Sequence, residues 1–160
     1  MRVGIVALGR MKQGPERELV ARYLERAVNG GRTLGLTGFA ITELSESRAG
    51  SAASRKSEEA KAIAAHLPEG GLVIALDERG KTLGSDDLAR RIGRWRDDGK
   101  AALSFVIGGA DGLDPVFVHK ADLALSFSPL TWPHQLVRIM LAEQLYRATT
   151  ILSGHPYHRE

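Results

Sequence analysis

Short runs of apolar and β-branched residues recur along the chain at intervals typical of β-strands. Most are apolar without interruption, which is the pattern of strands buried on both faces. A parallel sheet covered by helices on both sides buries its strands in this way. The five predicted strands are Arg2 to Leu8, Thr37 to Leu44, Leu72 to Asp77, Leu103 to Ile107, and Asp122 to Phe127.

Segments with helical periodicity lie between these runs. The predicted helices are Pro15 to Val28, a segment capped by Ser54 or Ser57 that ends near His66, a segment capped by Ser85 that ends at Gly99, and Pro133 to Leu152. Alternating strands and helices predict an α/β fold with a mostly parallel sheet and right-handed crossovers. The 160 residues suit one domain that spans 1–160.

The last predicted helix is apolar over an unusually wide arc. One face of a sheet rarely covers an arc of this width, so a partner subunit of a homodimer is one interpretation. A last helix that is well buried within its own chain is the other. The apolar positions are Leu136, Val137, Met140, Leu141, Leu145, Ala148 and Ile151.

The amino-acid composition excludes several kinds of site. The chain has no cysteine, which excludes disulfides, thiolate metal sites and cysteine nucleophiles. Lysine and arginine number 22 against 19 aspartates and glutamates, and the formal charge of +3 permits an anionic partner such as RNA without requiring one. The apolar run at the N-terminus is too short for a signal-peptide core with a cleavage site or for a membrane span. We therefore expect a cytoplasmic protein with no membrane partner.

Two loops follow strands at the carboxyl edge of the predicted sheet, where open α/β sheets bind ligands. They are Leu76 to Lys81 and Ile107 to Gly112. The second holds three glycines in five residues, which let the backbone approach a ligand closely, although a tight connecting turn accounts for them equally well. Neither loop matches G-x-G-x-x-G, and the chain has no G-x-x-x-x-G-K-[ST] motif. A nicotinamide or nucleoside-triphosphate enzyme is therefore disfavoured.

The loop from Ser126 to His134 carries two prolines, two aromatic residues and three hydroxyls directly before the longest helix. A rigid, partly apolar loop with free backbone amides suits a flat heteroaromatic ring such as adenine. The tail from His155 to Glu160 follows Gly154 and lies outside the helix. Such a tail is either disordered, as termini usually are, or stacks on a base and holds a phosphate. Its two histidines lack a third ligand, so no metal is expected.

Five segments together resemble the RlmH family of the SPOUT methyltransferases. The match runs over nearly the whole chain, from Val6 onward, and is most specific in the second half. The segments are Leu76 to Lys81, Phe105 to Gly109, Leu125 to His134, Glu143 to Ala148, and Pro156 to Arg159.

The resemblance implies a deep trefoil knot at the carboxyl end of the sheet and an obligate homodimer. It also implies methylation of N3 of a pseudouridine in 23S ribosomal RNA, within a stem-loop at the subunit interface, with S-adenosylmethionine as the methyl donor. The partner is then ribosomal RNA, free or in the assembled ribosome. Carried over by position, the cofactor contacts would be Leu76, Gly108, Gly109, Phe127, Ser128, Pro129, Leu130, Thr131 and Trp132.

Methyl transfer to a ring nitrogen depends mainly on holding the two reactants in line. The imide N–H must lose its proton, so a base, or a cation that stabilises the anion, is expected nearby. The candidates are His134, Arg138, Glu143 and Arg147 for catalysis, and Tyr157, His158 and Arg159 for holding RNA. Two other functions stay open: a SPOUT methyltransferase acting on another RNA such as transfer RNA, and a non-catalytic ribosome-binding module.

Overall fold

The computed structural model describes residues 1–158, and within them five parallel strands form one sheet in the order β2-β1-β4-β3-β5. The α/β fold predicted from the sequence is thereby confirmed. The strands are β1 (Arg2–Leu8), β2 (Thr37–Leu44), β3 (Leu72–Thr82), β4 (Ala102–Ile107) and β5 (Leu123–Ser126). The helices are α1 (Pro15–Gly31), α2 (Ala52–Ala64), α3 (Ser85–Asp97), α4 (Pro115–Lys120) and α5 (His134–Ser153), with a short 3-10 helix at Arg32–Leu34.

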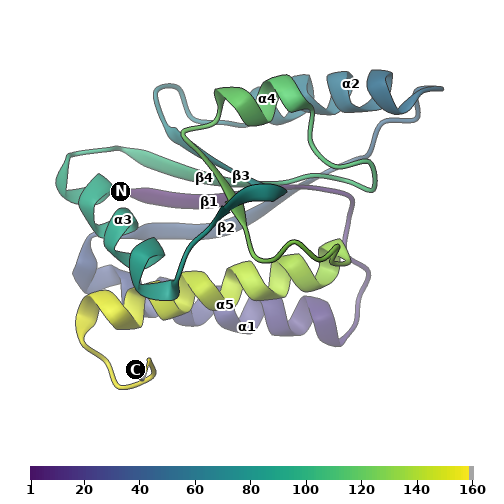
Figure 1. Ribbon diagram of the computed structural model, residues 1–160. Coiled ribbons are helices and arrows are strands. Elements are labelled where there is room, and N and C mark those ends of the chain that lie inside the picture. Colours follow the sequence, from purple (N-terminus) through teal and green to yellow (C-terminus); the bar gives the residue numbers. More distant parts are fainter. Residues whose placement is uncertain (159–160) are drawn as a thin grey trace.

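Helices cover both faces of the sheet (Figure 1). On one face, α1 and α5 lie side by side and α3 packs against α5; α2 and α4 cover the other face. Successive side chains of a strand point to opposite faces. Accordingly, Ile5 and Phe105 join the core beneath α1, α3 and α5, whereas Val6 and Val106 join the smaller core beneath α2 and α4. The uninterrupted apolar runs follow from this burial on both faces.

Strand β3 extends beyond its apolar run. The sequence predicts a strand that ends at Asp77 and a loop from Leu76 to Lys81, but β3 continues to Thr82. The two ends of the expected loop both pair with Leu125 of β5, so the residues between them bulge out of the ladder. The expected turn is thus an irregularity within a strand. The prediction of a separate loop was wrong in its extent, because pairing with β5 extends the strand through polar residues.

Two helices begin differently from the prediction. Ser51 is the N-cap of α2, and its hydroxyl accepts a hydrogen bond from the backbone N–H of Ser54 at 3.1 Å, so neither Ser54 nor Ser57 caps the helix. In α3, Ser85 is the first helical residue and Gly84 is the N-cap, without a side-chain hydrogen bond. Both capping predictions were wrong, the first because three nearby serines carry the same local signal.

Helix α4 was missing from the sequence prediction. Asp114 caps it and accepts hydrogen bonds from the backbone N–H groups of Val116 and Phe117, at 2.8 and 3.1 Å. Pro115 occupies the first turn, where its missing N–H costs nothing. An aspartate followed by proline is a readable helix start, but six residues are too few to show a periodic pattern.

Of the seven apolar positions in the wide arc on α5, three are buried within their own chain and three more are half-buried. Leu141, Leu145 and Ala148 are each at most 2% exposed and belong to the core beneath α1 and α3. Leu136 is 40% exposed and leaves part of the arc open at the start of the helix. Within residues 1–158, no helix has the length and apolarity that a bilayer crossing requires.

Candidate functional site

The three predicted turns meet at one pocket of about 880 Å³. It lies where the strands end and α5 begins; the start of α5 is on the right in Figure 1. Its walls are the bulge after Leu76, the glycine turn after Ile107 and the segment that leads from β5 into α5. The rule that ligands bind at the carboxyl ends of parallel strands located this pocket from sequence.

Hydrogen bonds fix the first wall to the third. The Ser126 hydroxyl donates to the carbonyl oxygens of Glu78 and Ser128, each at 3.0 Å, as alternative partners for its single proton. The Thr131 hydroxyl lies 3.3 Å from the Glu78 carboxylate, and Leu130 N–H donates to the Ser128 hydroxyl at 3.0 Å. These bonds give the segment after β5 a defined shape before any ligand binds.

The glycine turn is equally compact. Gly112 has a φ of +78° and its N–H donates to the Gly109 carbonyl at 3.0 Å, closing the turn. A Cβ on Gly108 would lie 2.8 Å from the carbonyl carbon of Gly112 and 2.9 Å from the backbone nitrogen of Leu113. The fold of the turn itself therefore requires a glycine at position 108, whether or not a ligand must approach the backbone there.

Most residues predicted to hold a cofactor line the pocket, whereas Pro129 is outside its lining. Leu130 and Trp132 stand at its rim with 66% and 40% of their surface exposed. Those that line it are Leu76, Gly108, Gly109, Phe127, Ser128, Leu130, Thr131 and Trp132.

The structure adds charged residues to the pocket that sequence reasoning missed. Lys56 of α2 and Asp111 of the glycine turn both line it. Asp77 and Arg79 line it too, and hydrogen bonds from the Arg79 guanidinium hold the pKa of the Asp77 carboxyl below its ordinary value. Glu78 is the fifth charged residue in the lining of the pocket. Four of these lie in segments already singled out, but Lys56 comes from a helix whose approach to the pocket has no local sequence signal.

The four catalytic candidates lie in different parts of the structure. His134 lines the pocket at the first turn of α5. Arg138 does not: its side chain is 2% exposed, and its guanidinium donates to Glu43 Oε1 at 2.8 Å and to the carbonyls of Leu8 and Gly9 at 2.5 and 2.8 Å. Burial lowers the pKa of Arg138, an effect that the carboxylates of Glu43 and Glu46 oppose. Arg138 thus ties the start of α5 to the end of β1, and the hypothesis that it touches substrate has no support in this chain.

Glu143 and Arg147 form a second cluster with the tail. The Arg147 guanidinium donates to Glu143 Oε1 at 2.5 Å, and the Tyr157 hydroxyl donates to the same oxygen at 3.1 Å. Arg147 Nη1 also lies 3.2 Å from His158 Nδ1, and Nε2 of that ring lies 3.3 Å from Asp86 of α3. The tail as far as His158 is therefore folded onto α3 and α5, not disordered. Arg159, the third predicted RNA contact, lies outside the described residues.

Tyr157 is held in its protonated form. Burial raises the pKa of its hydroxyl to about 12, and the Glu143 carboxylate adds to the rise. The ring also packs on Tyr146, with 4.6 Å between ring centres, and under the Arg147 guanidinium at 4.9 Å. In this arrangement Tyr157 donates a hydrogen bond at neutral pH and cannot serve as a base.

The tail cluster lies far from the pocket of the same chain. Helix α5 has 20 residues and starts at the pocket, whereas Tyr157 follows its end. Thirteen residues separate His134 from Arg147, which corresponds to about 20 Å along a helix at about 1.5 Å per residue. One chain therefore does not bring the four catalytic candidates together.

Comparison with known proteins identifies the class of enzyme to which this fold and pocket belong. A family model described as "Predicted SPOUT methyltransferase" matches residues 1–158. Proteins called "Ribosomal RNA large subunit methyltransferase H" from Bradyrhizobium diazoefficiens and Allorhizobium ampelinum are each 58% identical over 99% of this chain and 99% of their own. The chain belongs to the SPOUT methyltransferases and, within them, to the family of these relatives, as the resemblance predicted.

Among solved structures, a probable methylase family protein from Haemophilus influenzae aligns with a TM-score of 0.48 and 14% identity, over 99% of this chain and 70% of its own.

Enzymes of this family use S-adenosylmethionine as methyl donor, and the pocket suits it. The volume of about 880 Å³ is in the range of small-molecule sites. Leu76, Ile107 and Leu125 line it with apolar surface of the kind that an adenine ring needs, and the glycine turn adds backbone without side chains. Lys56, Asp77 and other charged groups at the walls match a ligand that carries a sulfonium, an ammonium and a carboxylate.

Proposed function

We propose that this methyltransferase methylates N3 of a pseudouridine in large-subunit ribosomal RNA. The single observation that carries the proposal is the convergence of the three turns on one pocket, in a chain 58% identical to proteins named for this ribosomal RNA. Bound S-adenosylmethionine would supply a methyl group on a positively charged sulfur, and in-line attack by a deprotonated ring nitrogen would take that methyl group with the thioether as the leaving group.

The chain's own residues mainly position the reactants. Leu76, Gly108 and Gly109, with the segment from Phe127 to Trp132, would hold the cofactor. His134 is the only one of the four catalytic candidates that lines the pocket, so we assign it the contact with the target base or its departing proton. Lys56, which lines the same pocket, suits an RNA phosphate or the developing negative charge on the base.

We further propose that the enzyme acts as a homodimer in which the tail of one subunit serves the pocket of the other. The support is the separation of about 20 Å along α5 between pocket and tail cluster. A second, partly apolar pocket of about 410 Å³ lies between α1, α3 and α5 and reaches Tyr23, Met140 and Glu143. A partner helix laid across this face would cover it.

We retain three further expectations: one SPOUT domain spanning 1–160, action in the cytoplasm on ribosomes without a metal, and a trefoil knot. The expectation of a knot rests on membership of the SPOUT family, and the bulge of β3 lies close to the strand that leads into the segment expected to be knotted. A Cβ on Gly80 would lie 2.6 Å from the carbonyl carbon of Ala124 in β5, so the bulge of β3 passes directly against that strand.

The function is tested by incubating the purified protein and S-adenosylmethionine with ribosomes from a strain that lacks the corresponding methyltransferase. We expect one added methyl group, located by mass spectrometry at N3 of a pseudouridine in the large-subunit RNA. Methylation of transfer RNA instead would shift the assignment to the first alternative. Binding to ribosomes with no transfer at all would favour the non-catalytic alternative.

Deleting residues 157–160 is expected to abolish methyl transfer while S-adenosylmethionine still binds. The deletion removes Tyr157 and His158 from the cluster on Arg147 but leaves the pocket walls intact. Activity on ribosomes and cofactor affinity by calorimetry are measured on the same preparation. A milder variant, Tyr157→Phe, removes only the hydrogen bond to Glu143 and serves as the graded control. Full activity after the deletion would contradict a role of the tail in RNA binding.

A further inference from the structure

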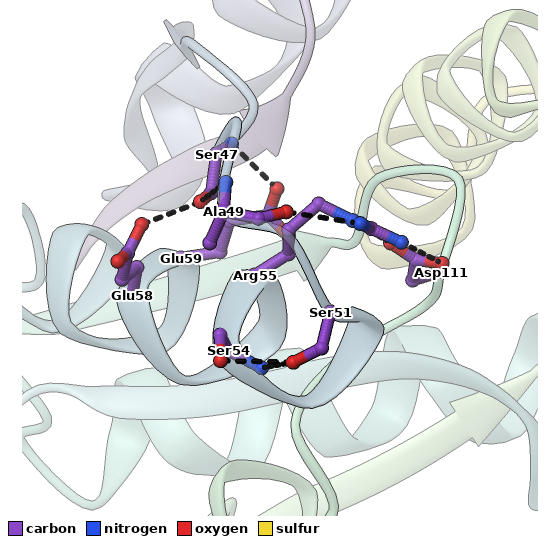
Figure 2. Close-up of polar contacts among 8 residues, drawn as sticks. All are labelled: Ser47, Ala49, Ser51, Ser54, Arg55, Glu58, Glu59 and Asp111. Atoms are coloured by element: carbon purple, nitrogen blue, oxygen red, sulfur yellow. Dashed lines mark hydrogen bonds and ion pairs between the residues drawn. The ribbon is translucent and has the colours of Figure 1, made fainter.

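An ion pair joins α2 to the glycine turn of the pocket (Figure 2). The Arg55 guanidinium donates to the Asp111 carboxylate twice, through Nε at 2.6 Å and Nη2 at 3.1 Å. Two parallel hydrogen bonds fix both the distance and the orientation of the carboxylate, which a single contact does not. The two side chains are 30% and 29% exposed, so water screens the pair only in part.

Arg55 also holds the segment that precedes α2. Its Nη1 donates to the carbonyl of Ala49 at 3.1 Å. Two glutamates further along α2 bind the same segment, because Glu59 accepts from the N–H of Ser47 at 2.9 Å and Glu58 accepts from its hydroxyl at 2.5 Å. Figure 2 shows these contacts gathered around the first turns of the helix. The first turns of α2 are therefore held in place by the preceding segment, which fixes the position from which Arg55 reaches Asp111.

Gly109 of the turn also lies close to the segment that precedes α2. A Cβ on Gly109 would lie 2.9 Å from Glu46 Oε1, so the Glu46 carboxylate packs directly on the turn. Inside the turn, the bond from Gly112 N–H to Gly109 carbonyl is the closing contact. Asp111 is the one residue of 108–112 with an ionic side chain, and its carboxylate is paired with the Arg55 guanidinium. The shape of the turn thus depends on residues 46–55 as well as on its own glycines.

We propose that Arg55 is a positioning residue that holds the turn at 108–112 in the shape that binds S-adenosylmethionine; this rests on the proposed function of the pocket. Arg55 itself is outside the pocket lining, whereas Asp111 and the turn are part of it. A loop already in its bound shape loses less conformational entropy when the ligand binds. Arg55 therefore controls cofactor affinity and leaves the transfer step of the bound complex unchanged.

The test is the Kd of S-adenosylmethionine by calorimetry for the full-length protein and for Arg55→Gln. We expect Arg55→Gln to raise the Kd about tenfold, the equivalent of about 1.4 kcal/mol, with kcat at saturating cofactor within about twofold. Arg55→Lys, which keeps the charge but not the paired geometry, should recover part of the affinity. Asp111→Asn should weaken binding at least as much as Arg55→Gln, because Asp111 also lines the pocket. The double variant should bind no more weakly than Asp111→Asn, because both lose the same ion pair.

A second measurement needs no cofactor. Hydrogen exchange of the free protein should be faster at the backbone N–H groups of 109–113 in Arg55→Gln and unchanged in the strands. Arg48→Gln is the matched control, since Arg48 is an exposed arginine of the same segment, and it should alter neither exchange nor Kd. A Kd for Arg55→Gln within twofold of the unaltered protein would overturn the inference alone. Failure of the unaltered protein to bind the cofactor would overturn the proposed function and this inference with it.

Discussion

Gly108→Ala is expected to weaken the binding of S-adenosylmethionine by about 100-fold, or about 2.7 kcal/mol. The added methyl group would lie 2.8 Å from the carbonyl carbon of Gly112 and 2.9 Å from the nitrogen of Leu113, both backbone atoms that cannot rotate away. The turn must open to admit it, and the backbone N–H and carbonyl groups that face the pocket then shift. Calorimetry measures the affinity, and circular dichroism at the same temperature checks that the variant is folded.

Two other glycines provide graded controls for this prediction. At Gly109 the one close contact of the added atom would be Glu46 Oε1, the end of a flexible side chain, at 2.9 Å, and its next neighbours would lie at 3.5 Å, so Gly109→Ala should cost less than Gly108→Ala. Gly109→Trp should still weaken binding strongly, because its indole would fill part of the pocket. At Gly50 nothing lies within 4 Å, and Gly50→Ala should leave the Kd unchanged. An unchanged Kd in Gly108→Ala would contradict the place of this turn in the cofactor site.

Arg138→Met should lower the free energy of unfolding by about 3 kcal/mol, in the range for breaking a buried ion pair by removing one partner. The methionine fills similar space but leaves Glu43 and the carbonyls of Leu8 and Gly9 without their donor. Adding Glu43→Gln should recover part of the loss, because the unpaired carboxylate is then neutral. Urea denaturation measures all three proteins.

The matched control for Arg138 is a helical arginine in an exposed ion pair. Arg90 and Asp87 lie 2.8 Å apart on α3 with 67% and 57% of their side chains exposed. Arg90→Met should change stability by less than about 0.5 kcal/mol, as is typical of surface pairs. Equal losses for Arg138→Met and Arg90→Met would contradict the assignment of Arg138 to the link between α5 and β1.

The sequence predicted the sheet and the pocket because both follow from local signals. Runs such as Ile5 to Leu8 are apolar at every position, which only a strand covered on two faces requires. The turns after Leu76, Ile107 and Leu125 converge because carboxyl ends of parallel strands share one edge. Neither inference needs knowledge of contacts between distant residues.

The roles of Arg138 and the tail could not be predicted in the same way. Arg138 stands on a helix where an arginine ordinarily faces water, and only the carbonyl groups of Leu8 and Gly9, about 130 residues earlier, reveal its burial. The tail is ordered because Tyr157 reaches Glu143 on α5, which is again a long-range contact. Arg55 belongs to the same class, since its partner Asp111 lies 56 positions further along the chain.

A crystal structure of the protein with S-adenosylhomocysteine tests the central claim most directly. We predict that the adenosine lies between the bulge after Leu76, the turn at 108–112 and the segment 127–132, with its sulfur facing the opening beside His134. Ligand density at the cavity between α1, α3 and α5, or anywhere else away from these three turns, would contradict the assignment of the pocket.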